Sequence, residues 1–107
     1  MTLNALYSAL VESSKAGEPL LTVREIAVLL HLRGRVDCST GEIAHALYIP
    51  KAAVTRAVDM LEGSLLAHRK RNPDDMRFVR VRLSLQGLAY LERLERRLAP
   101  AKTKAAA

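Results

Sequence analysis

The sequence predicts a mainly α-helical fold with one small β-hairpin, an α+β chain organised as a single domain over residues 1–99. Most of the chain places apolar residues at the three- and four-residue spacing of amphipathic helices. One run, 77–83, instead alternates apolar and cationic residues with the two-residue period of a strand. Hydrophobic residues make up 50% of the 107 residues and aromatic ones only 4%, so we expect an aliphatic core.

The charge and cysteine content narrow the function classes. The formal net charge is +6 at pH 7, and a small basic domain has a polyanion as its default partner, either nucleic acid or an anionic membrane surface. The one cysteine, Cys38, excludes an intramolecular disulfide and a cysteine-based metal cluster. No stretch approaches the ~20 apolar residues of a membrane span. We therefore expect a cytoplasmic protein that makes no use of the membrane.

Two amphipathic helices are expected at the start of the chain. An apolar stripe predicts the first helix over residues 1–16, and its members include Leu3, Leu6, Tyr7 and Leu10. Thr22 and Glu25 have the spacing of a capping box, which starts a second helix at Val23. Gly34 should end that helix. Its expected buried residues are Ile26, Ala27, Leu29 and Leu30.

A short extended segment at 36–38 leads into two helices separated by a tight turn. Ser39 and Glu42 repeat the capping-box spacing and start a helix over 40–47. Pro50 suits the first turn of the next helix, because its missing N–H costs nothing there. That helix has an apolar face of Val54, Val58 and Leu61. Its opposite face is small and polar, with Ala52, Thr55, Arg56 and Asp59, and Lys51 lies near its N-terminus.

A basic hairpin follows directly, with strands at 65–71 and 77–83 around a turn at 72–75. Its cationic residues are Arg69, Lys70, Arg71, Arg77, Arg80 and Arg82. The order of helix, tight turn, helix and charged hairpin is typical of a winged helix-turn-helix that binds DNA. We therefore expect residues 20–83 to form a DNA-binding core.

The last helix should begin after Ser84 and end before Pro100, and the tail 100–107 shows no pattern, so we expect it to be disordered. The flanking segments 1–16 and 84–99 carry apolar stripes that could pack as plain core or join two copies of the chain. We favour a homodimer, because a second copy doubles the phosphate contacts. The candidate dimerisation residues are Leu3, Leu6, Tyr7, Leu10, Leu88, Leu91, Leu94 and Leu98.

The polar helix face has the chemistry needed to read a DNA major groove, which just admits an α-helix. Arg56 can bind guanine with two hydrogen bonds, and Thr55 can bond to a base or a phosphate. Ala52 can touch a thymine methyl group, and Lys51 suits a phosphate. For any one of these residues alone, an ordinary surface role is the simpler explanation; the whole face beside a basic hairpin favours double-stranded DNA.

The hairpin offers a second mode of contact. Arg77 lies close to its turn, where it could enter a narrow minor groove, and Asp75 could orient the guanidinium. The alternative is that Asp75 and Arg77 form only a surface ion pair. The remaining cations are assigned to phosphates or solvent, and they are Arg69, Lys70, Arg71, Arg80 and Arg82.

Other reactive residues show no arrangement that indicates chemistry. Cys38 is expected to be a small buried residue, since a role as an oxidant sensor has no support in its neighbours. The histidines are scattered without metal-ligand spacing, and they are His31, His45 and His68. There is no catalytic constellation, so we expect no enzyme activity, no cofactor and no metal.

The chain resembles the MarR family of bacterial transcription regulators over about residues 21–94. The resemblance is carried by several short motifs in the family's order. These are Leu21-Thr22, Ser39-x-x-Glu42-Ile43-Ala44, the run from Ala53 to Glu62 (AVTRAVDMLE), Arg69 followed by Asp74-Asp75-Met76-Arg77, and Leu83-Ser84-x-x-Gly87. One departure is that the family's Gly-Leu-Val after the recognition helix appears here as Gly63-Ser64-Leu65-Leu66, shifted by one residue.

The resemblance implies a homodimeric repressor on a palindromic operator. It places Lys51, Thr55 and Arg56 in the major groove, and Arg77, with Asp75, in the minor groove. Many members release DNA on binding a small molecule or on cysteine oxidation. The sequence stops at Ala107, before the family's last long helix, so we expect the pocket for a small-molecule effector to be incomplete. The alternative function is a winged helix that binds another protein and has no specific DNA target.

Overall fold

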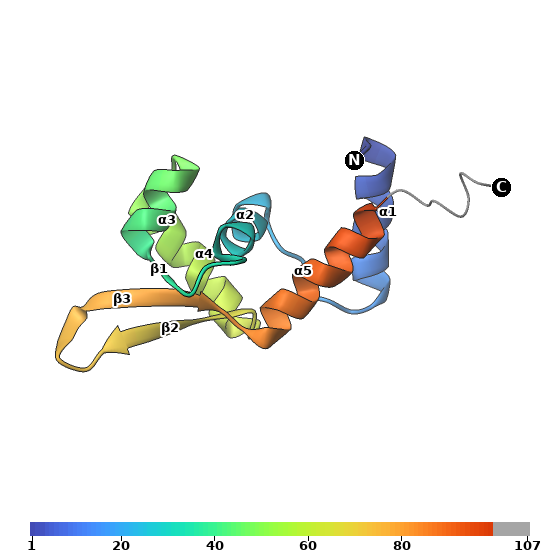
Figure 1. The fold of residues 1–107 in the computed structure, drawn as a ribbon. Coiled ribbons are helices and arrows are strands. Elements are labelled where there is room, and N and C mark those ends of the chain that lie inside the picture. The colour runs from blue at the N-terminus through green and yellow to red at the C-terminus, as the bar shows by residue number, and fades with distance from the viewer. Residues whose placement is uncertain (100–107) are drawn as a thin grey trace. The chain divides into compact units, whose positions relative to one another are not determined.

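The computed structural model describes residues 1–99, with the side chains of residues 76–78 excepted. The predicted tail 100–107 therefore lies outside the described residues. The elements are α1 (Leu3–Lys15), α2 (Val23–Leu32), β1 (Cys38–Ser39), α3 (Thr40–Leu47), α4 (Lys51–Gly63), β2 (Ala67–Asn72), β3 (Asp75–Leu83) and α5 (Leu85–Leu98). The predicted α+β class is confirmed, as is the order of its helices and hairpin (Figure 1).

The strands form an antiparallel sheet in the order β1-β3-β2. In the hairpin Ala67 pairs with Leu83, and the register shifts between Arg71 and Asn72 near the turn. The predicted extended segment at 36–38 overlaps β1 only at Cys38, and Cys38 pairs with Val81. Figure 1 shows β2 and β3 extending away from α2, α3 and α4. The β2–β3 hairpin, called the wing below, is therefore paired at its base with β1, the segment that precedes the helix-turn-helix.

The chain divides into two compact units, one from Leu21 to Tyr90 and one made of Met1–Leu20 with the chain from Leu91 onward. The core of the first unit is aliphatic, as predicted; its fully buried large side chains include Val28, Leu29, Leu32, Ile43, Val54, Val58, Leu61 and Val81. The expected inner face of α2 was partly wrong, because Leu30 is exposed and Val28 and Leu32 are buried instead.

The helix starts follow the predicted caps with two differences. The capping box of α2 is complete, since Thr22 accepts from the amide of Glu25 at 3.1 Å and the Glu25 carboxylate accepts from the amide of Thr22 at 3.0 Å. At α3 only the first half forms, with Ser39 Oγ accepting from the Glu42 amide at 3.0 Å. Pro50 is the residue before α4 rather than within its first turn.

The connection from α4 to β2 begins at Gly63, the glycine that the sequence comparison found shifted by one residue. Gly63 is the last residue of α4, and the left-handed backbone conformation falls on Leu65, with φ of 64°. Gly87 in α5 packs against this connection so closely that a Cβ there would lie 2.0 Å from the carbonyl oxygen of Leu66. Ser84 Oγ also donates to the carbonyl of Leu65 at 2.7 Å. The start of α5 is therefore fixed against the strand entry.

The second unit leaves part of its apolar surface exposed. In α1 the buried residues are Ala9 and Ser13, whereas Leu3, Tyr7 and Leu10 are exposed. Leu91 and Leu94, by contrast, are 1% and 8% exposed within the single chain. These two candidate dimerisation residues belong to the chain's own core, because almost none of their surface is left for a second copy.

An ion-pair network holds this second unit together. The carboxylate of Glu18 accepts from Arg93 at 2.6 Å and from Arg97 at 2.7 Å, and Arg97 also donates to Ser13 at 2.9 Å. The Arg97 guanidinium, more than any other group, lowers the pKa of Glu18 to about 2. In residues 1–99 no helix is both long enough and apolar enough to cross a membrane.

Candidate nucleic-acid interface

The exposed face of α4 has the composition that the sequence predicted. Its buried residues are Ala53, Val54, Ala57, Val58 and Leu61. Its exposed residues include Lys51, Ala52, Thr55 and Arg56. Neither Lys51 nor Arg56 has an ion-pair partner among the described residues, so both charges remain available to a ligand. Apolar spacing alone positions this face, because burying one side of the helix turns the other outward.

Arg69 binds groups of the chain itself, whereas the prediction gave it DNA phosphates or solvent as partners. Its guanidinium binds Asp59 at 2.7 Å and Glu62 at 2.8 Å, and it donates to the carbonyl of Thr55 at 3.2 Å. The side chain is only 14% exposed. The assignment of Arg69 to DNA phosphates or solvent was therefore wrong, because α4 itself supplies its partners. This contact joins the recognition helix to the first strand of the wing.

Glu62 is the second anchor of that contact. It accepts from the backbone amide of Arg69 at 3.1 Å as well as from the guanidinium. The hydrogen bond from the Arg69 backbone amide is the largest cause that lowers the pKa of Glu62, and the Arg69 guanidinium lowers it further. Burial acts in the opposite direction and raises this pKa. The sequence carried a signal for this pairing, because Asp59 and Glu62 are three residues apart on one helix side.

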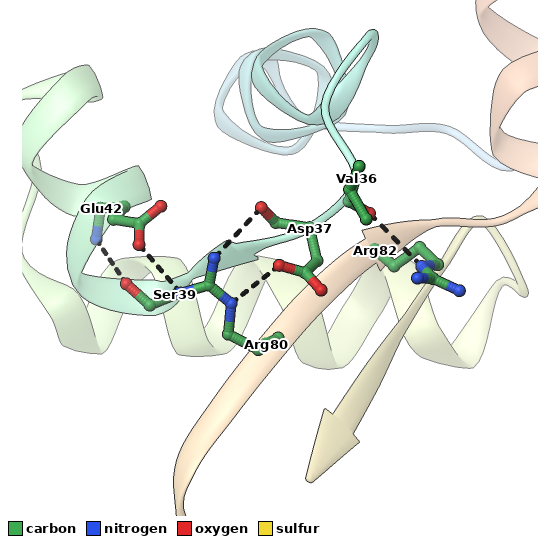
Figure 2. A network of polar contacts seen from close by, with 6 residues as sticks. All are labelled: Val36, Asp37, Ser39, Glu42, Arg80 and Arg82. Carbon is green, nitrogen blue, oxygen red and sulfur yellow. Dashed lines mark hydrogen bonds and ion pairs between the residues drawn. The ribbon is translucent and has the colours of Figure 1, made fainter. Parts of the chain in front are cut away.

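Arg80 is held in a similar way on β3. Figure 2 shows its guanidinium between Asp37 and Glu42. The Nε atom lies 2.8 Å from Asp37 Oδ1, and Nη1 lies 2.9 Å from Glu42 Oε1. The hydrogen bond from Arg80 to Asp37, more than that to Glu42, raises the pKa of the guanidinium. The sequence assigned Arg80 to phosphates or solvent, and the structure shows that two carboxylates of the chain also bind it. The Glu42 carboxylate that could have completed the α3 capping box is used here instead.

The remaining wing cations are not all equivalent. Arg82 donates through Nε to the carbonyl of Val36 at 3.3 Å, so part of its guanidinium binds the chain itself (Figure 2). Lys70 and Arg71 are exposed on β2 and have no ion-pair partner in the part of the chain that the structure describes. Asp75 is half-buried at the start of β3. The side chain of Arg77 lies outside the described residues, so its minor-groove role and its pairing with Asp75 stay predictions.

A cleft connects these groups. It has a volume of about 590 Å³ and lies between the start of α3, the exposed face of α4 and the sheet. Its lining includes the carboxylate-bound Arg69 and Arg80, the free Lys51 and Arg71, and the Thr55 side of α4. The structure therefore brings together residues of α4 and β2 that the sequence could place only on separate elements.

The other candidate reactive groups are structural. Cys38 is buried in β1, as predicted, and burial first of all raises the pKa of its thiol. Burial likewise lowers the pKa of His31. Among the described residues no group of three or more His, Cys, Asp or Glu side chains could hold a metal ion.

Comparison with known protein families identifies the winged unit. The model described as the MarR family matches residues 21–79, more than half of the chain. The chain belongs to the MarR family. The resemblance inferred from the motifs is therefore confirmed, and the chain is a DNA-binding transcription regulator of the winged helix-turn-helix class.

Several solved structures share the fold. The YusO protein from Bacillus subtilis is 25% identical with a TM-score of 0.75, over 97% of this chain and 70% of that one. The transcriptional regulator BldR from Sulfolobus solfataricus is 27% identical with a TM-score of 0.65, over 73% and 55%. A mutant MarR from E. coli, complexed with operator DNA, is 24% identical with a TM-score of 0.71, over 91% and 67%. None of the curated proteins matches this chain.

Proposed function

We propose that this MarR-family chain is a homodimeric repressor that binds a palindromic double-stranded DNA operator. In this proposal α4 enters the major groove and the β2–β3 wing contacts the adjacent minor groove and backbone. The chain spans 55% to 70% of the YusO and BldR structures, and the operator complex belongs to the E. coli protein. The proposal therefore rests on the surface of this chain as well as on its family.

One observation carries the proposal. The face of α4 that points to solvent presents Ala52, Thr55 and Arg56 in its first two turns, with Met60 as an exposed apolar residue one turn further on, and the Arg56 charge has no partner among the described residues. A small, polar helix face lets the helix backbone approach base edges closely, and a free arginine is the commonest reader of guanine. Such a face has no role in the chain's own core.

The division of the basic residues supports the same function. Arg69 and Arg80 hold the wing against α4 and α3, which fixes the geometry of the reading surface. Lys51, Lys70 and Arg71 have no ion-pair partner in the described part of the chain, so their charges can displace counterions from phosphates. In this proposal Arg77 enters the minor groove.

A homodimer would place two such surfaces on the two halves of a palindrome. Its support in this chain is the exposed apolar stripe of α1, formed by Leu3, Tyr7 and Leu10. Leu6 and Leu98, which are half-buried, and Leu88, which is partly exposed, could extend that surface. Leu91 and Leu94 are excluded because they are buried in the chain itself.

Fluorescence anisotropy with labelled DNA tests the proposal. A duplex taken from upstream of the chain's own coding sequence is compared with a scrambled duplex of equal length at two salt concentrations. We expect the upstream duplex to bind more tightly, to resist unlabelled competitor, and to lose affinity steeply as salt rises. Equal binding to both duplexes, together with tight binding to a protein partner, would instead favour an interaction module.

A further inference from the structure

The cleft between α3, α4 and the sheet has a positive lining. Its charged residues are Lys51, Arg69, Arg71, Arg80 and Asp59, four cations against one carboxylate. Thr40 and Thr55 add hydroxyl groups to the same lining. A cleft of about 590 Å³ with this chemistry suits an oxyanion that accepts several hydrogen bonds.

The four cations fall into two classes. Arg69 is bound by Asp59 and Glu62, and Arg80 by Asp37 and Glu42, so each guanidinium is already matched by two carboxylates. Lys51 and Arg71 have no such partner among the described residues. The uncompensated positive charge of the cleft therefore comes from one residue of the recognition helix and one of the wing.

The alternation of β2 separates Arg71 from its neighbour. Arg69 and Arg71 both line the cleft, whereas Lys70 between them does not, because successive side chains of a strand point to opposite faces. Lys70 is exposed and carries the same charge as Arg71. It is therefore a matched control on the same strand.

We propose that Lys51 and Arg71 jointly hold one and the same backbone phosphate of the DNA in this cleft. The inference rests on the proposed function and adds to it that helix and wing are coupled through a shared ligand. The Arg71 guanidinium can offer two parallel donors and the Lys51 ammonium a third, and Thr55 also lines the cleft. The Asp59 carboxylate repels the phosphate less than a free one, because Arg69 binds it.

The salt dependence of DNA binding distinguishes a shared phosphate from separate ones. Each neutralised phosphate of B-DNA contributes ~0.9 to the slope of log K against log salt concentration. Because a homodimer on a palindrome makes each contact twice, we expect Lys51→Gln and Arg71→Gln each to lower that slope by up to ~2, and the double variant to lower it by no more than ~2 in total. Lys70 should contact a different phosphate or none. The slope loss of a variant that combines Lys70→Gln with Lys51→Gln should therefore equal the sum of the two single losses. All of these side chains are exposed, and circular dichroism checks that each variant is folded.

A second experiment replaces single phosphates of the upstream duplex by uncharged methylphosphonates. We expect one position in each half-site at which the substitution weakens binding by the wild type, weakens binding by Lys70→Gln equally, and leaves binding by the double variant unchanged. A double-variant slope loss near ~4, or none, overturns the shared phosphate while the proposed function stands. Absence of salt-dependent DNA binding by the wild type overturns the proposed function and this inference together.

Discussion

Arg56 and Arg69 show how the surroundings of a residue decide its role. Both are arginines on or beside α4, in a basic region of the sequence. Arg56 projects from the exposed face without a partner among the described residues, whereas Arg69 is enclosed by two carboxylates and a backbone carbonyl. A guanidinium that already has two carboxylate partners gains little from a phosphate, so the two side chains differ in function although they are chemically identical.

Replacing Arg56 by Ala should relax sequence specificity. Loss of a bidentate guanine contact costs about 1–3 kcal/mol at the base it reads, while binding to scrambled DNA changes much less. Anisotropy titrations on upstream and scrambled duplexes measure the ratio of the two affinities. Arg77→Ala serves as the comparison, because a minor-groove contact should weaken both duplexes more evenly. Unchanged affinities in both variants would contradict the proposed docking geometry.

Leu65 is a site of backbone strain. It has a left-handed φ of 64° and is 66% exposed, so its side chain contributes little burial to offset the conformational cost. We expect Leu65→Gly to raise the free energy of unfolding by up to about 1 kcal/mol, because glycine adopts this conformation freely. Urea unfolding followed by circular dichroism measures the change.

The opposite substitution supplies the control for Leu65. Gly34 has φ of 82° and open space around its α-carbon, so Gly34→Ala tests conformation without a steric clash. It should destabilise the chain by about 1 kcal/mol. If both variants shift stability in the same direction, backbone strain is not the cause.

At the level of the elements, two pairs of contacts set the wing. Arg69 joins β2 to α4 and Arg80 joins β3 to α3 and to the segment before β1. A two-stranded ribbon alone is marginally stable in water, so a projecting hairpin needs anchors at its base. These anchors are polar, and they use cations that composition alone would assign to DNA.

The Glu18 network gives the unit of α1 a pH dependence. The folded pKa of Glu18 is about 2, below the ordinary value of 4.5, so its carboxylate stabilises the fold above pH 4.5. This contribution, at most about 3 kcal/mol, is lost as the pH falls from 4.5 towards 2. Glu18→Gln should therefore destabilise the chain at pH 7, and its difference from the wild type should shrink at pH 3.

Urea titrations at both pH values measure the effect, with circular dichroism as the readout. Glu12→Gln is the matched control, because Glu12 is an exposed carboxylate of α1 without an ion-pair partner among the described residues. It should change stability by less than about 0.5 kcal/mol at either pH. A Glu18→Gln effect that is equally large at pH 3 and pH 7 would show that the charge is not responsible.

For the whole molecule, the main prediction concerns assembly. Serine at Leu3, Tyr7 and Leu10 together should convert a dimer into a monomer, because these side chains are exposed in the single chain and would be buried between two copies. Sedimentation velocity measures the state. The control places serine at Val23 and Leu85, which are 85% and 84% exposed but lie on α2 and α5.

Comparing the two variants shows whether a change in assembly comes from the α1 surface or from any loss of exposed apolar residues. The control should remain dimeric and bind the upstream duplex like the wild type. The triple variant should lose affinity for a palindrome much more than for one half-site, because only a dimer engages both halves. A wild type that sediments as a monomer even with DNA bound would remove the dimer from the proposed function.

The sequence by itself determined the helices, the hairpin, the exposed face of α4 and the family. These features depend on local patterns, since periodicity, caps and turn residues act over a few neighbouring positions. For the basic residues, the sequence-based prediction missed contacts between distant parts of the chain. The partners of Arg80 lie 38 and 43 residues away, and those of Arg69 lie on a different element.

Only the tertiary structure decided which cations are used internally and which remain free. It paired Arg69 and Arg80 with carboxylates, left Lys51 and Arg71 at one cleft, and buried Leu91 and Leu94 while exposing Leu3 and Tyr7. The physical reason is that charge pairing and burial depend on distances in space. A local pattern shows which face of an element turns outward, but the packing of other elements decides what that face meets.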